Sequence, residues 1–261
     1  ARPEKGVPAA LAPRASAWND ALGMNRPHGE LETELVRHRA EFQARFAAAG
    51  TPRLFFSPGR VNLMGAHLDY NGGPVMPTAI DRGTFLAVRP RTDRRVRFES
   101  TLDGHALEFE LDAVPESRSS AWSDYPLGVL RQMLELAELR GGTARLPGLE
   151  LLFGGNLPVG AGLSSSASIC VGTAFVLDRL WELESERMEL VQAALRAERG
   201  FVGVQCGIMD PFAVGLARPG ELLWLDCRDT TWSWMPLDAR VYSIAIADTL
   251  VRRELAQGAF N

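Results

Sequence analysis

Residues 156–168 read NLPVGAGLSSSAS, the most informative stretch of the chain. Gly160 and Gly162 allow backbone angles that other residues resist, and they place no side chain in the way of a ligand. Three serines follow, and then apolar residues recur at helical spacing, so we predict a glycine-rich turn that opens a helix. Free N–H groups and the positive end of the helix dipole would favour a phosphate anion there. Composition alone also allows a flexible loop with a serine N-cap.

On both sides of this loop, strand-like and helix-like segments are interleaved, which predicts an α/β or α+β protein. The predicted helices are residues 30–49, 124–140, 164–182 and 185–199. The predicted strands are residues 84–90, 95–100, 106–111, 149–153, 222–226 and 241–248. Residues 54–64 are expected to form two strands with a break at Ser57-Pro58-Gly59, and residues 1–29 a loose leader rich in Pro, Gly and Ala.

The composition of the 261 residues is that of a globular protein, with 46% apolar and 23% charged residues. The net charge of −4 and the lack of a basic stripe argue against a nucleic-acid partner. No apolar run approaches the roughly 18 residues of a membrane span. Three widely separated cysteines favour reduced thiols, so we expect a cytoplasmic monomer with small-molecule partners. The chain opens on Ala1 and stops at Asn261, and we expect it to be a piece of a longer protein.

Four stretches, in one order along the chain, resemble the GHMP kinases (galacto-, homoserine, mevalonate and phosphomevalonate kinases). The stretch PVGAGLSSSAS resembles their phosphate-binding motif, and residues 57–73, SPGRVNLMGAHLDYNGG, resemble the galactokinase signature. Residues 203–229, GVQCGIMDPFAVGLARPGELLWLDCRD, resemble the segment that carries the catalytic aspartate, and residues 122–129, WSDYPLGV, give a weaker match. The resemblance covers about residues 30–261 and points to the galactokinase-like branch.

The resemblance implies an α+β fold with the two-domain architecture of GHMP kinases and the active site in the cleft between the domains. The first domain would be ribosomal protein S5 domain 2-like and would span residues 30–235, after the leader of residues 1–29. Residues 236–261 would be the truncated start of the C-terminal domain or a connection to it. The second domain would therefore be largely missing from this chain.

The resemblance also implies a catalytic pair. Asp210, in GIMDP, would be the general base toward a sugar hydroxyl. Arg60, in SPGRVN, would lie beside it, keep the carboxylate ionised and stabilise charge during the transfer. Without the resemblance, Asp210 would pass for a surface turn residue before Pro211, and Arg60 for a surface cation.

ATP and Mg²⁺ are the cofactors that the resemblance implies. Glu198 lies twelve residues before Asp210, and this spacing implies a magnesium ligand paired with Ser166, with Ser165 as second choice. An exposed charge on a helix is the alternative for Glu198. The residues expected to bind the nucleotide phosphates are Gly160, Gly162, Leu163, Ser164, Ser165 and Ser166.

The sugar would be held by His67 and Asp69 of GAHLDY, and by Gly207. An aspartate can accept hydrogen bonds from two adjacent hydroxyls, which is how a site reads sugar stereochemistry. The alternative for His67 is a structural histidine with its hydrogen bonds satisfied.

The chain departs from the galactokinase pattern mainly on the sugar side. Ala66 stands where the family usually has a glutamate that contacts the sugar near its sixth carbon, and Leu68 where it has a threonine. Pro211 replaces the usual glutamine, and Phe260 stands where a tyrosine commonly contacts the sugar. Loss of the carboxylate would relieve repulsion against a substrate that carries its own, such as galacturonic acid, and GAHLD resembles a galacturonokinase pattern.

We therefore expect an ATP-dependent sugar 1-kinase that transfers the γ-phosphoryl group to the anomeric hydroxyl of galactose or a close relative. A galacturonate kinase is the first alternative. A non-catalytic, galactokinase-like sensor of sugar and ATP is the second alternative. Loss of the catalytic residues would favour a sensor, but Arg60, Asp210, Glu198 and the serine loop are all present. A mevalonate- or homoserine-type kinase is disfavoured because His67 and Asp69 suit a polyhydroxylated substrate.

Overall fold

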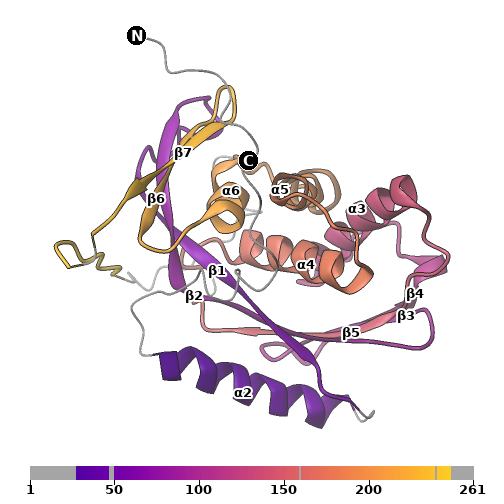
Figure 1. Ribbon diagram of the computed structural model, residues 1–261. Coiled ribbons are helices and arrows are strands. Elements are labelled where there is room, and N and C mark those ends of the chain that lie inside the picture. The colour runs from indigo at the N-terminus through magenta and orange to yellow at the C-terminus, as the bar shows by residue number, and fades with distance from the viewer. Residues whose placement is uncertain (1–27, 47–49, 159, 239, 248–261) are drawn as a thin grey trace.

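A mixed β-sheet with helices on both faces forms the body of the computed structural model, which describes residues 28–46, 50–158, 160–238 and 240–247 (Figure 1). The helices are α2 (His28–Arg45), α3 (Asp124–Arg140), α4 (Ser165–Trp181), α5 (Arg187–Arg196) and α6 (Met209–Leu216), with a 3₁₀ turn η1 (Leu111–Ala113) and a π-helical turn η2 (Ala197–Val202). The strands are β1 (Arg53–Met64), β2 (Pro74–Pro90), β3 (Arg95–Ser100), β4 (Ala106–Glu110), β5 (Leu149–Gly155), β6 (Glu221–Asp226) and β7 (Thr231–Pro236).

The long strand β2 organises the sheet, whose order is β4-β3-β5-β2-β6-β7, with β1 also paired to β2. Its second half, Thr84–Pro90, pairs with β5, whereas Pro74 and Val75 at its start pair with β6. Strand β1 runs antiparallel to both halves. Strands β3 and β5 are parallel, and the other pairs are antiparallel. One strand therefore joins two sets of partners that are distant in sequence.

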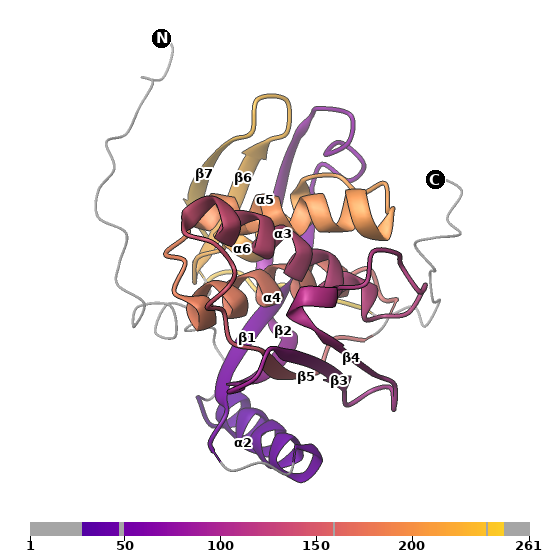
Figure 2. The same ribbon diagram turned by 90° about the vertical axis from the view of Figure 1, so that its right-hand side faces the viewer.

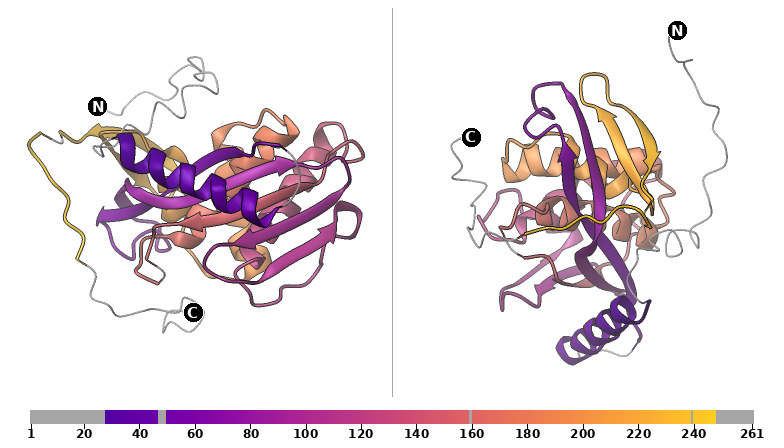
Figure 3. Two further views of the ribbon diagram at one scale, coloured as in Figure 1. Left: turned by 90° about the horizontal axis from the view of Figure 1, so that it is seen from below. Right: turned by 90° about the vertical axis from the view of Figure 1, so that its left-hand side faces the viewer.

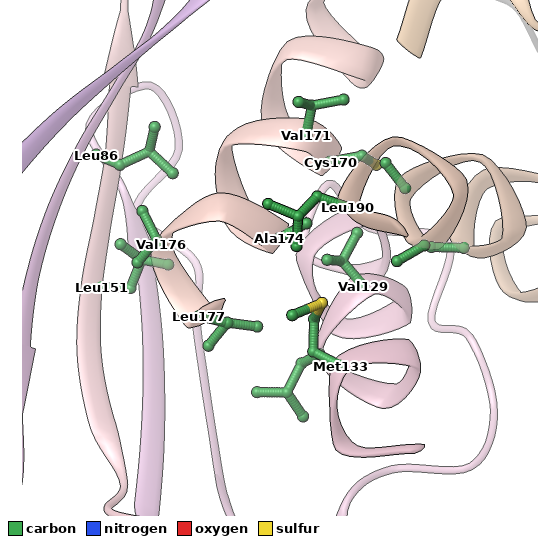
Figure 4. Packing of buried hydrophobic residues seen from close by; sticks show 14 of the residues in the cluster. Leu86, Val129, Met133, Leu151, Cys170, Val171, Ala174, Val176, Leu177 and Leu190 are labelled. Carbon is green, nitrogen blue, oxygen red and sulfur yellow. The ribbon is translucent and has the colours of Figure 1, made fainter. Parts of the chain in front are cut away.

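Helix α4 lies between the sheet and the helices α3 and α5 (Figure 4). Val176 lies toward Leu86 and Leu151 of the sheet, and Leu177 lies toward Met133. Val129, Met133 and Leu190 of the two outer helices lie on the other side of α4 from the sheet. All of these side chains are at most 3% exposed. Figure 2 shows the same order of layers from the side. Because packing on both sides fixes α4, it also fixes the place of the helix N-terminus that follows the glycine-rich loop.

Helix α2 covers the opposite face of the sheet (Figure 3). Phe42 and Phe46 pack against Ala87 and Leu152 in a small separate core. His38 is 4% exposed, and its Nε2 lies 3.1 Å from the carbonyl oxygen of Leu152. Burial lowers the pKa of His38, although the bond to the Leu152 carbonyl opposes this shift.

The chain should lose stability in mild acid, and His38 should account for part of the loss. A folded pKa below the ordinary 6.5 means that the unfolded chain takes up the proton more readily. The stabilising contribution is therefore complete above about pH 6.5 and shrinks as the pH falls below it. Urea unfolding from pH 7.5 to 5 should show a weaker pH dependence for His38→Gln than for the wild type. The exposed His105, changed to glutamine, is the control, and identical slopes for both variants would contradict the prediction.

Several predicted elements are confirmed, and α3 has the predicted bounds. Others were wrong. Residues 54–64 are one continuous strand, because Pro58 and Gly59 are absorbed in a bulge where the register shifts between Pro58 and Arg60. The first helix begins at His28, so residues 28 and 29 are not part of a leader, and it ends at Arg45; residues 1–27 and 47–49 lie outside the described part. Residues 241–247 form no strand, and Asp248 lies outside the described part.

The sequence analysis also missed three elements. The first half of β2, residues 74–83, was assigned no structure; it begins at Pro74, and buried residues such as Val75, Pro77 and Ile80 alternate with more exposed ones along most of its length. Helix α6 begins one residue before Asp210 and carries Pro211 in its first turn, where the missing N–H is not needed. Strand β7 was not predicted either. None of the described helices is long and apolar enough to cross a membrane, and Cys170, Cys206 and Cys227 are free.

Candidate active site

The glycine-rich loop has the backbone that its sequence predicts. Gly160 and Gly162 have φ of 70° and 74°, in the left-handed region that glycine enters at little cost. Helix α4 begins at Ser165, and the N–H groups of its first turn have no acceptor within the helix. Ser168 holds the helix start in place, because its Oγ donates to the carbonyl of Ser57, 2.8 Å away. The loop therefore delivers free backbone donors at a fixed point, as an anion site requires.

Arg60 links strand β1 to both the loop and helix α6. Its Nε donates to Oδ1 of Asp210 at 2.7 Å, and its Nη1 donates to the carbonyl of Gly162 at 2.8 Å. Its backbone N–H donates to the carbonyl of Leu163 at 3.2 Å. The Arg60 side chain is only 13% exposed. The surface-cation alternative is therefore wrong, and the guanidinium cannot move without disturbing the loop.

Asp210 lies in the first turn of α6, so the surface-turn alternative is wrong as well. Its second oxygen, Oδ2, accepts a hydrogen bond from Oγ of Ser164 at 2.5 Å. An anion in the first turn of a helix is stabilised by the helix dipole. The carboxylate is still 26% exposed, so a bound hydroxyl can reach it. A carboxylate that is held by two donors and still accessible can act as a general base.

Glu198 is 2% exposed and lies in the π-helical turn η2, so the exposed-charge alternative is wrong. Burial raises its pKa to about 7, a hydrogen bond with Ser166 opposes this rise, and the charge of Asp210 adds to it. Its Oε2 is buried without a hydrogen-bond partner. Such an orphaned carboxylate oxygen is costly unless a ligand satisfies it. π-Helical turns are rare in proteins, and those that do occur are often found at functional sites.

Two of the predicted sugar residues, His67 and Asp69, lie in the turn that connects β1 and β2, and the third, Gly207, lies just before α6. Asp69 is half-buried, and burial and the charge of Asp210 raise its pKa, which places the two carboxylates near each other. Gly207 packs directly on Asp69: a Cβ at Gly207 would lie 1.6 Å from Oδ2 of the aspartate. His67 is exposed, and its Nδ1 lies 2.6 Å from the hydroxyl of Tyr70. Asp69 and Gly207 are thus close to Asp210. The ring of His67 is held by Tyr70 of the same turn.

The structure brings most of the predicted residues together from distant parts of the sequence. Phe260 lies outside the described residues, so nothing is known of its place. The sequence analysis missed the link from Ser164 to Asp210, and it gave no role to Tyr125 and Cys206, which flank Glu198 closely enough to feel its charge. The weak match at residues 122–129 was the only indication of Tyr125.

Comparisons with known proteins show the family of the chain. Residues 40–90 match the family model described as galactokinase galactose-binding signature, and residues 124–218 match GHMP kinases N terminal domain. The galactokinase of Clostridium tetani is 35% identical over 94% of this chain and 58% of its own length, and that of Fusobacterium nucleatum is 40% identical over 85% of this chain and 56% of its own. The chain thus spans little more than half the length of these curated relatives.

A solved structure, the galactokinase of Lactococcus lactis complexed with galactose, superposes with a TM-score of 0.71. It is 37% identical and is matched over 78% of this chain and 52% of its own. The mevalonate kinase of Methanococcus jannaschii superposes with a TM-score of 0.60 at 18% identity, over 72% of this chain and 57% of its own. That second likeness concerns the fold alone.

Proposed function

Because the chain belongs to the galactokinase branch of the GHMP kinases, we propose that it provides the sugar and phosphate half of an ATP-dependent sugar 1-kinase. The proposed reaction moves the γ-phosphoryl group of ATP to the anomeric hydroxyl of galactose or a close relative. The observation that carries the proposal is the contact of Asp210 with both Arg60 and the phosphate-loop residue Ser164. This contact puts a carboxylate base and an anion-binding loop within one hydrogen bond of each other.

In the proposed step, Asp210 accepts the proton of the anomeric hydroxyl as the bond from that oxygen to the γ-phosphorus forms. The bond from the γ-phosphorus to the bridging oxygen breaks, and ADP leaves with its electron pair. Arg60 keeps its positive charge beside the carboxylate and beside the loop, where it stabilises negative charge during the transfer. Backbone N–H groups of the loop and of the first turn of α4 bind the phosphates.

A magnesium ion fits the donor atoms near the loop. Glu198 offers a buried oxygen without a partner, and the hydroxyl of Ser166 is bonded to the same carboxylate. Carboxylate and hydroxyl oxygens suit Mg²⁺, which commonly uses few protein ligands together with substrate phosphates. The ion would neutralise phosphate charge, and we assign Glu198 and Ser166 to hold it.

We further propose that Asp69, His67 and Gly207 form the sugar side of the site. Asp69 is the carboxylate among these residues, the charge of Asp210 contributes to its raised pKa, and Gly207 leaves it room. Residues 30–235 would be the N-terminal domain, and residues 236–261 the start of, or the link to, a second domain; the end of β7 at Pro236 supports this boundary. We also propose a cytoplasmic monomer; the three free cysteines support the reducing compartment.

The identity of the sugar depends on Ala66, which is exposed in the turn beside His67. A glutamate is usual there in the galactokinases that the turn resembles, and its absence leaves room for a substrate with a carboxylate at carbon six. This is the observation that favours galacturonate as the second candidate.

Ala66→Glu should raise kcat/KM for galactose by about 10-fold, because a hydrogen bond to a charged group contributes about 1.5–3 kcal/mol. The same change should lower kcat/KM for galacturonate, because two carboxylates would then face each other. Leu63→Glu adds the same charge at an exposed position three residues earlier and is the control. If Ala66→Glu leaves the ratio of the two kcat/KM values unchanged, the place assigned to this residue is wrong.

The decisive experiment is a kinetic panel on the intact gene product with ATP and Mg²⁺. Galactose, galacturonate, N-acetylgalactosamine and arabinose are each offered, and formation of ADP and of the sugar 1-phosphate is followed. We expect turnover of galactose or galacturonate far above the other sugars. Equal and negligible turnover of all four sugars would refute the proposal and favour a sensor.

A further inference from the structure

Ser164 precedes helix α4 but does not cap it in the usual way. An N-cap serine ordinarily has an extended backbone, and its side-chain oxygen accepts a hydrogen bond from the first turn. Ser164 instead has φ of 60° and ψ of 47°, in the left-handed region, and makes no side-chain cap bond. Residues other than glycine, asparagine and aspartate rarely adopt this conformation. An outlier that also gives up its ordinary bond calls for another role.

The hydroxyl of Ser164 donates to Asp210, 46 positions further along the chain. The Oγ to Oδ2 distance is 2.5 Å, as in a charge-assisted bond, and Ser164 is 8% exposed. Arg60 binds the other oxygen, Oδ1, at 2.7 Å. With one donor on each oxygen, the carboxylate plane cannot rotate freely. Each oxygen still has a lone pair for a further donor. The two hydrogen bonds from Ser164 and Arg60 therefore orient the Asp210 carboxylate and leave it able to accept a proton.

The serines of this segment have different partners. Ser166 is bonded to Glu198, and Ser168 is bonded to Ser57 and Thr84 on the neighbouring strands. Ser164 alone among these three reaches Asp210. The Ser164 side chain therefore has a different partner from Ser166, which is bonded to Glu198, and from Ser168, which is bonded to the neighbouring strands. Its effect on catalysis can be tested by itself.

We propose that Ser164 is a positioning residue for phosphoryl transfer, holding the Asp210 carboxylate in the rotation in which it accepts the proton of the sugar hydroxyl. This inference rests on the proposed kinase function. Ser164 keeps its own proton throughout: the sugar proton goes to Asp210, the sugar oxygen bonds to the γ-phosphorus, and ADP leaves. Because Ser164 belongs to the phosphate loop, the orientation of the base depends on the conformation of the loop that binds ATP.

The test compares Ser164→Gly and Ser164→Ala in the intact gene product. Both variants lack the hydroxyl, but glycine fits the left-handed backbone and alanine does not. We expect both to lower kcat by about 10-fold or more, the amount expected for a hydrogen bond to a charged group. KM for ATP and for the sugar should change by less than about 2-fold, as expected when only transition-state stabilisation is lost. The melting temperature of Ser164→Gly should not fall.

Two further variants separate this role from a structural one. Ser120 is also a serine with positive φ, at 64°; it is exposed, and its N–H donates to Asp124, which is not among the proposed site residues. Ser120→Gly is therefore the matched control and should keep the wild-type kcat. In an Asp210→Asn background, adding Ser164→Gly should cause no further loss, because a residue that acts through Asp210 cannot act without it.

The outcomes are distinguishable. If the wild type turns over sugar and Ser164→Gly keeps its kcat, the positioning role is overturned while the kinase function stands. A further 10-fold loss in the Asp210→Asn background would also overturn it. If the wild type turns over no sugar at all, both proposals fail.

Discussion

Asp210→Asn should lower kcat by about 10²- to 10⁴-fold, the range that general acid–base catalysis usually contributes. The amide has the shape of the carboxylate but cannot take the proton of the sugar hydroxyl. It also ends the ion pair with Arg60, whose guanidinium then lies against the loop without its counter-charge. Steady-state kinetics with ATP and the preferred sugar would measure the loss, and calorimetry would check that the sugar still binds.

Asp112→Asn is the matched control for this change. Asp112 also pairs with an arginine, Arg94, through two hydrogen bonds of 2.7 and 2.9 Å, but it lies exposed outside the proposed site. We expect its kcat to equal that of the wild type. A loss of less than 10-fold in Asp210→Asn would mean that another group accepts the proton. A sensor, by contrast, would keep ligand-dependent partner binding in the Asp210→Asn variant.

The largest effect on stability is expected at Glu150, in the middle of the sheet. Glu150 is 5% exposed and accepts hydrogen bonds from Arg89 and Arg91, the latter at 2.7 Å. Arg89 is 8% exposed and lies over the ring of Phe42 on α2. Glu150→Ala removes the buried carboxylate that both arginines bind. Breaking a buried pair from one side costs about 3–5 kcal/mol, and urea unfolding should show a loss of this size in the free energy of unfolding.

Glu108→Ala is the control for Glu150. Both glutamates lie opposite Arg97 in the sheet, one on β4 and one on β5. The ion pair of Glu108 is with Arg95, and both side chains are about half exposed. An exposed pair contributes about 0–1 kcal/mol, so this variant should unfold almost as the wild type does. If Glu150→Ala and Glu108→Ala lose the same free energy of unfolding, burial does not determine how much each ion pair contributes to stability.

Much of the fold could be predicted, because periodicity and turn residues reflect local physics. Helix α3 ends at Gly141 as predicted, since its apolar residues recur at helical spacing and a glycine follows. The early half of β2 and the whole of α6 were not predicted, and each contains a proline near its start, Pro74 and Pro211, a residue that normally interrupts regular structure. In the folded chain, Pro74 stands at the first position of its strand and Pro211 in the first turn of its helix.

The residue types of the candidate site could be read from the sequence, but their contacts could not. The bond from Ser164 to Asp210 depends on a left-handed backbone at one serine and on the packing of two helices, and no local pattern encodes either. The burial of Glu198 was equally hidden, because a π-helical turn looks like any helix in the spacing of its apolar residues. The side chains that surround Glu198 come from other helices, and only tertiary structure brings them there.

Strand β2 has a consequence for how the molecule can be divided. It is inserted between β5 and β6, which follow it in the chain, so a cut in the connection at Gly141 and Gly142 would separate β1–β4 from their neighbours. Neither fragment would have a complete sheet, and the first would lack α4, against which its strands are buried. The two fragments should be unable to fold separately but able to complement each other when mixed. We therefore expect the described body to unfold cooperatively, as a single unit in which β2 joins the two parts of the sheet.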